Sequence, residues 1–281
     1  MNESENARVA VLYIGFKEYG LTPFKAFLES YRSKSAGLTH TLNIALKGFA
    51  DLGDARQYID EISDLDCTSF VVNNTGYDIG TYYDFARNSS YSYYCFLNSK
   101  SLILDNNWLG KIYDYAQLPD VGMVGATGSF ESLLTDYLQQ RKEAGKLWWP
   151  WREMVRNSWF NELRHRLYFP SFPNIHLRTN AFMIRKEVFL NLRHRPIINR
   201  IDAARFESGR HSVSRQIKSM KLYVLVVGRD GNAYNSDNWA ESGTFWQGNQ
   251  TNLLVADNQT EKYDTSIEAQ RRLLSRKAWG R

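Results

Sequence analysis

Short apolar runs alternate with amphipathic segments through the first half of the chain. Five runs have the length of a strand: 9–15, 41–46, 69–73, 93–97 and 121–126. Segments with helical spacing of their apolar residues lie between them, at 22–32, 55–63, 79–87 and 102–117. Continuous apolar runs are typical of strands buried on both faces of a parallel sheet. The alternation therefore predicts an α/β fold with a doubly wound, mostly parallel, Rossmann-like sheet.

The second half departs from this alternation. Residues 130–169 predict two helices around the segment Trp148-Trp149-Pro150-Trp151, which we interpret as a helical insertion over about 130–170. Further strands are expected at 180–184 and 222–228, and further helices at 186–192, 210–220 and 266–277. Residues 231–259 are polar and typical of loops. We expect one domain over 1–240, with a C-terminal loop and helix (241–281) packing on it.

Composition excludes some classes of protein. With 23% charged and 43% hydrophobic residues, the chain of 281 residues is typical of a globular protein and not of a disordered one. The formal net charge is only +5, and no nucleic-acid-binding motif is present, so we expect no nucleic-acid partner. The 8 Trp, 17 Tyr and 15 Phe fit a packed core, and they also fit rings that stack on sugars.

The ends and the cysteines favour a cytoplasmic location. The first eight residues lack the cationic start and apolar stretch of a secretory signal. The longest apolar runs are far shorter than the ~20 residues that span a bilayer. Cys67 and Cys95 form neither a CxxC motif nor a disulfide framework, as expected of thiols in a reducing compartment.

Several familiar sites are missing from the sequence. It has no GxxxxGK[ST] loop, no GxGxxG after the first strand, no GxSxG elbow and no zinc-binding spacing among its five histidines. Ligands of doubly wound sheets bind at the carboxyl ends of the strands. The candidate residues therefore follow the predicted strands, at 15–17, 47–48, 74–78, 98–100 and 126–128.

The segment Asn73–Gly80 (NNTGYDIG) carries the most distinctive chemistry of these strand ends. Gly76 and Gly80 allow backbone to approach a ligand closely. Asp78 comes just before a predicted helix, where its carboxylate can cap the helix or accept hydrogen bonds from a ribose or a base. Both interpretations of Asp78 remain open on the sequence.

Six stretches then carry a family resemblance. They are Tyr13–Phe16, Asn73–Ala86, Tyr93–Ile103, Val121–Ser129, His176–Phe189 and Arg205–Ile217. Their order along residues 9–230 resembles nucleotide-sugar glycosyltransferases of the GT-A fold, in the family 2-like group that includes rhamnan-synthesis-like bacterial enzymes. The resemblance implies inverting transfer of a sugar from a nucleotide-sugar donor to a glycan or lipid-linked acceptor, in cell-surface polysaccharide synthesis.

The resemblance and the strand ends together suggest the donor-binding residues. They are Tyr13, Gly15, Lys47, Gly76, Asp78, Gly80, Asn98 and Lys100. The family usually holds Mn²⁺ or Mg²⁺ with an Asp-x-Asp motif after the fourth strand, but this chain has Asn98-Ser99-Lys100 there. A divalent metal prefers carboxylate oxygens, whereas a lysine offsets diphosphate charge directly. We therefore expect weak or absent metal dependence, with Asp257 as a weak candidate ligand.

The resemblance also implies catalytic and acceptor-binding residues. Glu207 stands where the family has its acidic motif, so it is the candidate base, with Asp202 as the second choice. An inverting transfer needs a carboxylate that takes the proton of the acceptor hydroxyl. Arg178, Asn180 and Trp246 are candidates for contact with the acceptor. Without the Asp-x-Asp motif, an inactive GT-A-like protein that only binds glycan or nucleotide stays an alternative.

The tryptophan-rich segment is the remaining distinctive feature. Between Arg141 and Arg166 there are seven cations and three anions, interleaved with Trp148, Trp149, Trp151 and Trp159. Tryptophan beside lysine and arginine is typical of helices that lie at a membrane surface. The same pattern fits aromatic packing with a solvated basic face. Peripheral contact with the inner face of the membrane is therefore one of two interpretations.

Overall fold

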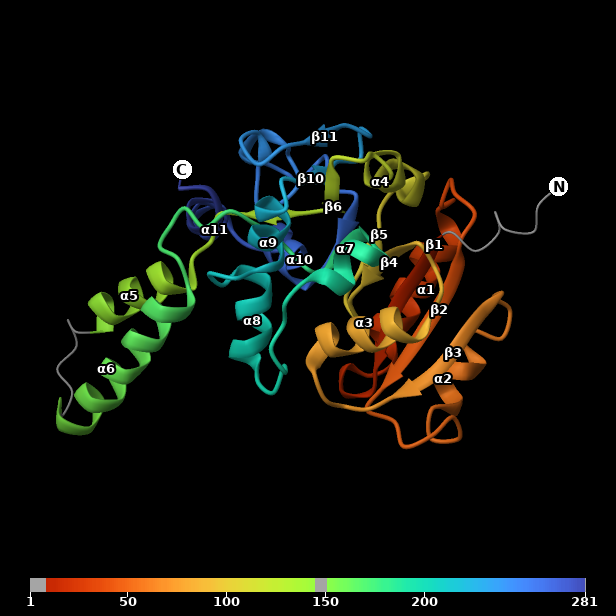
Figure 1. The fold of residues 1–281 in the computed structure, drawn as a ribbon, viewed down its shortest axis with the longest axis horizontal. Helices are drawn as coiled ribbons and strands as arrows, with labels where there is room; N and C mark the ends of the chain where they lie inside the picture. The colour runs from red at the N-terminus through yellow and green to blue at the C-terminus, as the bar shows by residue number, and fades with distance from the viewer. Residues whose placement is uncertain (1–8, 145–150, 281) are drawn as a thin grey trace.

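The computed structural model describes residues 9–144 and 151–280, so Trp148, Trp149 and Pro150 lie outside the described residues. Its centre is an eight-stranded sheet with the order β11-β10-β6-β9-β4-β1-β2-β3 (Figure 1). These strands are β1 (Val9–Phe16), β2 (Thr41–Lys47), β3 (Cys67–Val72), β4 (Tyr93–Leu97), β6 (Val121–Gly125), β9 (Ala181–Arg185), β10 (Tyr223–Val227) and β11 (Ala233–Tyr234).

The sheet is mixed but mostly parallel. Strand β1 pairs in parallel with β2 and β4, β2 with β3, and β6 with β10. Strand β9 runs antiparallel between β4 and β6, and β11 runs antiparallel along the edge at β10. The prediction of an α/β fold with a mostly parallel sheet is confirmed.

Both faces of the sheet are buried, as the apolar runs indicate. Alternate side chains of β1 point to opposite faces. Val9, Val11 and Tyr13 belong to one core cluster, and Leu12 and Ile14 to the other. The first cluster includes residues of α1 (Leu21–Ser33), α2 (Arg56–Asp60) and α4 (Trp108–Ala116). The second includes residues of α3 (Tyr77–Asn88), α7 (Lys186–Asn191), α8 (Arg200–Ser208), α9 (Val213–Ser219), α10 (Asn258–Asp264) and α11 (Glu268–Trp279).

The helix predicted over 102–117 is wrong in its first third. Residues Leu102–Ile103 form the short strand β5, which pairs antiparallel with β12 (Val255–Ala256), and the helix begins only at Trp108. A partner 150 residues away in the chain is invisible to local periodicity, which explains the error. Loop 231–259 also contains a 3-10 turn (Trp239–Glu241), and another lies at Lys17–Tyr19.

Helix α8 was not expected, and it changes the setting of Glu207. The residue lies in the last turn of α8 and not in a loop before the next helix, which begins at Val213. Helix α8 begins with a capping box in which the side chain of Asn199 accepts backbone N–H groups and Asp202 reciprocates. Its weak amphipathic pattern hides it in the sequence, because Phe206 and Ser208 are its fully buried residues.

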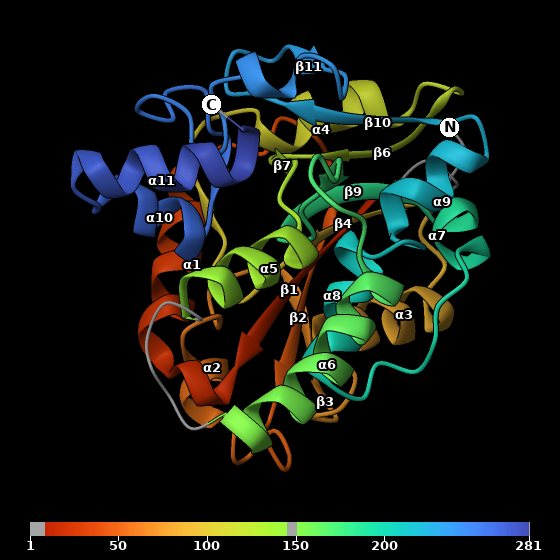
Figure 2. The ribbon, with the colours of Figure 1, turned by 90° about the vertical axis from the view of Figure 1, so that its left-hand side faces the viewer.

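The insertion consists of two helices, α5 (Leu133–Ala144) and α6 (Trp151–Tyr168), that project from the sheet layers as a pair (Figure 1). A second short ribbon, β7 (Gly128–Ser129) with β8 (His176–Leu177), lies at its base. The C-terminal helix α11 lies beside the start of α5 (Figure 2), where Lys277 pairs with Glu131 and Asp136. Within the described ranges, no helix is both long and apolar enough to cross a membrane.

Candidate functional site

A cavity of about 490 Å³ opens at the carboxyl ends of β3 and β4. The first half of the chain contributes Tyr77 and Asp78 after β3, and Asn98 after β4. The opposite wall comes from the approach to β9, from α8 and from the C-terminal helices. Its polar residues are Glu131, His176, Arg178, Thr179, Asn180, Arg200, Glu207, Ser208, Asp257, Asn258, Gln259, Lys262 and Lys277. Ligand binding is expected at this edge of the sheet.

Four carboxylates line this cavity, and two of them, Asp78 and Glu207, come from α3 and α8. Glu207 Oε1 accepts the backbone N–H of Thr179 at 3.0 Å, which fixes its orientation. Within the described part of the chain, no partner is found for Glu207 Oε2 or for the Asp78 carboxylate. Burial raises the pKa of Asp78, Lys47 works against that rise, and Glu207 adds to it. The two carboxylates therefore lie close enough to influence one another.

The buried ammonium group of Lys47 orders the loop that carries Asp78. Its Nζ donates to the carbonyl oxygens of Thr75 (2.9 Å) and Tyr77 (2.8 Å) and to Thr81 Oγ1 (3.1 Å). Three bonds use all the protons of an ammonium group, and Lys47 is only 3% exposed and does not line the cavity. We therefore assign Lys47 a positioning role behind the site in place of the expected contact with the donor.

The two glycines of this loop also serve its backbone. Gly76 adopts a φ of +73° at the start of α3, where a side chain is strained. A Cβ on Gly76 would lie 2.9 Å from Gly80 Cα, so the loop closes on itself at this point. Asp78 lies in the first turn of α3 and makes no cap, because Gly76 occupies the cap position. Asp78 is thus left facing the cavity.

Tyr13 and Gly15 lie in the core and not on the cavity wall. The Tyr13 ring stacks on Phe27 at 3.6 Å, and its hydroxyl donates to the carbonyl oxygen of Ser99 at 2.9 Å. A Cβ on Gly15 would contact Phe24 and Leu46. Both residues are buried and neither lines the cavity, so a contact of either with the donor stays a prediction that the geometry does not support. The Tyr13 hydroxyl thus holds the turn after β4 against β1.

The turn after β4 places Asn98 in the cavity and Lys100 beside it. Asn98 Oδ1 accepts the backbone N–H of Lys100 (3.0 Å) and the hydroxyl of Ser101 (3.1 Å). The Lys100 ammonium lies 4.6 Å from the centre of the Tyr19 ring. Burial raises the pKa of Tyr19, and the charge of Asp78 adds to that rise.

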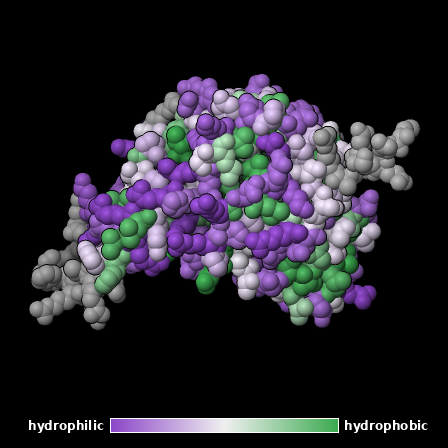
Figure 3. All heavy atoms as spheres, viewed as in Figure 1, coloured by the Kyte–Doolittle hydropathy of each residue, from purple (hydrophilic) through white to green (hydrophobic). Residues whose placement is uncertain are grey.

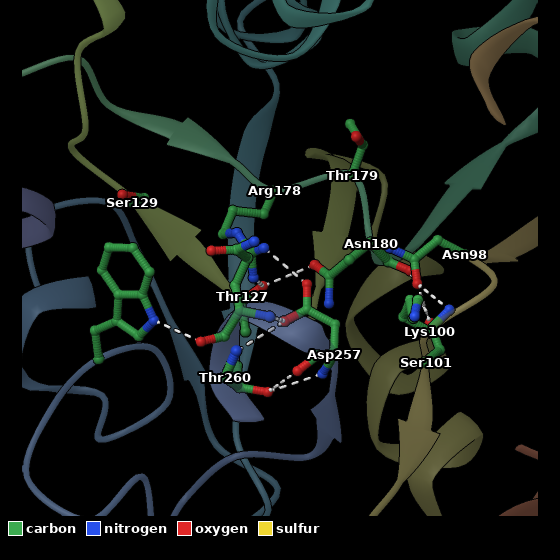
Figure 4. Close-up of polar contacts among 12 residues, drawn as sticks. Asn98, Lys100, Ser101, Thr127, Ser129, Arg178, Thr179, Asn180, Asp257 and Thr260 are labelled. Atoms are coloured by element: carbon green, nitrogen blue, oxygen red, sulfur yellow. Dashed lines mark hydrogen bonds and ion pairs between the residues drawn. The ribbon is translucent and has the colours of Figure 1, made fainter. Parts of the chain in front are cut away.

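Asn180 carries an unused hydrogen-bond donor. Its Oδ1 accepts the hydroxyl of Thr127 at 2.8 Å, and its backbone carbonyl accepts the Asn98 N–H at 2.9 Å (Figure 4). Its Nδ2 is buried without a partner, although Asn180 lines the cavity. A buried amide that lacks a partner costs free energy, so this group is suited to a polar ligand atom.

Arg178 and Asp257 form a buried ion pair at the back of the site (Figure 4). Arg178 Nη2 lies 2.7 Å from Asp257 Oδ2, and its guanidinium stacks 4.2 Å from the centre of the Phe245 ring. Asp257 Oδ1 accepts the backbone N–H groups of Gln259 and Thr260, each at 3.0 Å. Because both of its oxygens are used, Asp257 is better explained as the cap of α10 than as a metal ligand.

The residues of the cavity do not fit the divalent ion that the family resemblance implies. Among residues 9–144 and 151–280, no three His, Cys, Asp or Glu side chains gather in a way that can hold a metal. Asn98 and Lys100 stand where the family has carboxylates, and Asp257 is committed to Arg178. Hard divalent cations need several oxygen ligands, and the free side chains of this cavity do not supply such a set.

Sequence reasoning missed the cations that the C-terminal half brings to the cavity. Arg200 and Lys262 line it, and no carboxylate partner is found for either among the described residues. Lys277 is neutralised by Glu131 (3.2 Å) and Asp136 (2.8 Å). For Lys262 and Lys277, the sequence signal was the basic charge of the last twenty residues. That charge does not reveal that α10 and α11 return to the sheet.

Two other candidates are placed differently from expectation. The Trp246 ring is mostly buried, stacks on Phe245 at 4.4 Å, and donates from Nε1 to the carbonyl of Gln259 at 2.9 Å. It forms part of the cavity wall with little surface left for an acceptor. Asp202 does not line this cavity, and its carboxylate accepts the backbone N–H groups of Ile198 and Asn199. We therefore do not retain Asp202 as a base.

Comparison with known proteins gives fold-level likeness alone. No family model matches the sequence, and no curated protein matches it. The structure is similar to the mannosyltransferase PcManGT from Pyrobaculum calidifontis, solved with GDP-Man and Mn²⁺ (13% identity, TM-score 0.46, 83% of this chain and 58% of that one). It is similar to mouse xyloside xylosyltransferase 1, with 10% identity, a TM-score of 0.42, and coverage of 79% of this chain and 84% of that one. It is also similar to the bifunctional glycosyltransferase WbbM, with 11% identity, a TM-score of 0.44, and coverage of 99% of this chain and 46% of that one. The chain thus spans about half the length of two of these proteins.

Replacement of Lys47 by methionine tests its positioning role. Lys47→Met leaves the carbonyls of Thr75 and Tyr77 without their donor, so we expect a loss of about 2 kcal/mol in the free energy of unfolding. Urea denaturation measures this loss, with the exposed Lys25→Met as the matched control. An unchanged stability would contradict the role assigned to Lys47.

Replacement of Asp78 by asparagine tests the electrostatics of the cavity. Because the pKa of Asp78 is raised in the folded protein, its ionisation costs stability as the pH rises above the range of a free aspartate. Asp78→Asn should therefore raise the melting temperature at pH 7, and the gain should vanish near pH 3. A melting temperature lowered at pH 7 would count against this assignment.

Proposed function

We propose that the protein is a glycosyltransferase that moves a sugar from a nucleotide-sugar donor to a hydroxyl of a glycan or lipid-linked acceptor. The observation that carries the proposal is the pairing, in one cavity at the strand ends, of a positioned carboxylate with a free oxygen and a buried unpaired amide. A sugar presents hydroxyls that suit Asp78 and Asn180, and a diphosphate presents charge that suits Arg200 and Lys262. The order of motifs along the sequence supports the same reaction class.

The proposed chemistry is inverting and uses Glu207 as the base. Glu207 Oε2 takes the proton of the acceptor hydroxyl while that oxygen forms a bond to the anomeric carbon. The bond from the anomeric carbon to the diphosphate breaks at the same time, and the nucleoside diphosphate leaves with the electron pair. Arg200 and Lys262 offset its negative charge, since positioned cations stabilise charge that develops in the transition state. The bond from Thr179 N–H keeps the Glu207 carboxylate in place.

The setting that we propose is cell-surface polysaccharide synthesis at the inner face of the membrane. Helix α6 supports peripheral membrane contact, because Trp159, Phe160, Leu163 and Leu167 are each between 40% and 60% exposed. Figure 3 shows such hydrophobic side chains along the projecting pair of helices. Apolar side chains beside arginines are suited to the surface of an anionic membrane.

One observation favours a second candidate function. The turn after β4 has no carboxylate, so the protein can alternatively bind a nucleotide sugar or a glycan without catalysing transfer. Slow hydrolysis of the donor in the absence of acceptor separates the two: a transferase releases nucleoside diphosphate, and a binding protein does not.

Removal of the base tests the proposed mechanism. Glu207→Gln keeps an oxygen for the Thr179 N–H but cannot accept a proton, so kcat should fall by about 10²–10⁴-fold with donor affinity retained. Release of nucleoside diphosphate is measured beside the exposed control Glu187→Gln. If Glu207→Gln keeps its turnover while Asp202→Asn loses it, the base has been assigned wrongly.

Chelation tests the handling of the diphosphate. Because arginine and lysine take the place of the usual metal ligands, we expect turnover with EDTA to stay within about twofold of turnover with Mn²⁺. Arg200→Glu should lower donor affinity under both conditions. Activity that disappears in EDTA and returns with Mn²⁺ would overturn this part of the proposal.

A further inference from the structure

A second, larger cavity of about 780 Å³ lies on the other side of α8. Its walls are the end of α6, the segment between α7 and α8, helix α8 itself and α9. Four arginines line it: Arg193, Arg195, Arg205 and Arg210. We name this space the arginine cavity. Among the described residues, Asp202 is the one carboxylate that lines it, so its walls carry an excess of positive charge.

The structure itself uses only part of this charge: Arg210 Nε and Nη2 donate to the carbonyl oxygen of Arg166 at 3.2 and 3.0 Å. The carboxylate of Asp202 takes part in the cap of α8, and its Oδ1 lies 3.6 Å from Arg205 Nη1. The Arg205 guanidinium also lies 3.8 Å from the centre of the Tyr168 ring. In the ranges that the structure describes, no side chain pairs with the guanidinium groups of Arg193 and Arg195, and both residues are exposed. Arginines gathered without carboxylates are suited to the oxygens of a phosphate group, which they bind through two parallel hydrogen bonds.

The position of the arginine cavity relates it to the candidate active site. Helix α8 separates the two: Asp202, Arg205 and Phe206 line the arginine cavity, while Ala203, Ala204 and Glu207 line the other. A helix with its side chains is about 10–12 Å thick. One extended molecule can therefore place a hydroxyl at Glu207 and an anionic group among the arginines.

The surface beside the arginine cavity is apolar along α6. Phe160, Leu163 and Leu167 follow one another at helical spacing on one exposed face, and Leu167 also lines the arginine cavity. Figure 3 shows hydrophilic side chains over α8 next to the hydrophobic ones of α6. An apolar strip that ends in a cluster of cations matches a molecule with a phosphate next to a hydrocarbon chain.

We propose that the arginine cavity binds the phosphate or diphosphate group of the acceptor. This inference rests on the proposed function, because it assumes an acceptor whose hydroxyl reaches Glu207. It adds a binding site for the anionic part of the acceptor, separate from the cations Arg200 and Lys262 that face the donor. Arg193 and Arg195 hold the phosphate oxygens, and the apolar face of α6 lies against the chain attached to them.

Calorimetric titration of the full chain with inorganic pyrophosphate tests the site directly. Arg193→Glu and Arg195→Glu should each weaken pyrophosphate binding by about tenfold, as expected when a charged hydrogen-bonding partner is replaced by a repelling one. The exposed Arg56→Glu, on α2, makes the same change of charge away from both cavities and should bind like the wild type. Circular dichroism checks that each variant is folded.

Two results would overturn the inference: no binding of pyrophosphate, or binding that only Arg200→Glu weakens, which would locate the anion in the donor site. Flotation with phosphatidylcholine vesicles, with or without phosphatidic acid, distinguishes the source of the phosphate. Loss of binding to phosphatidic acid in Arg193→Glu indicates a lipid phosphate, and pyrophosphate binding without vesicle binding indicates a soluble phosphate ester. Donor hydrolysis by the wild type tests the proposed function separately, so the two failures can be told apart.

Discussion

The candidate site depends on one buried ammonium group. Lys47, at the end of β2, lies behind the loop that follows β3 and donates to the carbonyl oxygens of Thr75 and Tyr77 and to the hydroxyl of Thr81 in α3. Burial lowers the pKa of this lysine, and the nearby Asp78 raises it. A buried charge is costly unless it is paired and hydrogen-bonded, and here the compensation is local. The ammonium therefore fixes the loop and supplies a positive charge that acts on Asp78.

The opposite wall of the cavity is held by a second buried pair, and this arrangement leaves few groups for a ligand. Arg178 and Asp257 satisfy one another, and Lys277 is paired with Glu131 and Asp136. Among the described residues that line the cavity, the groups left without a partner include Glu207 Oε2, the Asp78 carboxylate, Asn180 Nδ2 and the two cations Arg200 and Lys262. Unpaired carboxylates, an amide and cations in one cavity are the groups that we propose bind a nucleotide sugar.

Sequence periodicity was sufficient for the sheet but not for the site. The runs at 9–15, 41–46 and 93–97 are strands because strands buried on both faces are apolar throughout. The strand β5 was missed because its partner β12 is remote in sequence, and α8 was missed because few of its residues are buried. Glu207 and Asp78 were proposed from the sequence, and both line the cavity. Arg200 and Lys262 were not proposed, because no local pattern reveals that α8 and α10 lie at this edge of the sheet.

The central claim is that this cavity binds a nucleotide sugar through protein cations. It is tested most directly by the melting temperature of the protein with UDP-, GDP-, dTDP- and CMP-sugars in EDTA. A ligand at about 100 times its Kd stabilises the native state by about 2.7 kcal/mol. We expect one class of nucleotide sugar to raise the melting temperature without metal, and we expect Arg200→Glu to abolish the rise. No rise with any of the four, or a rise that Arg200→Glu leaves intact, would contradict it.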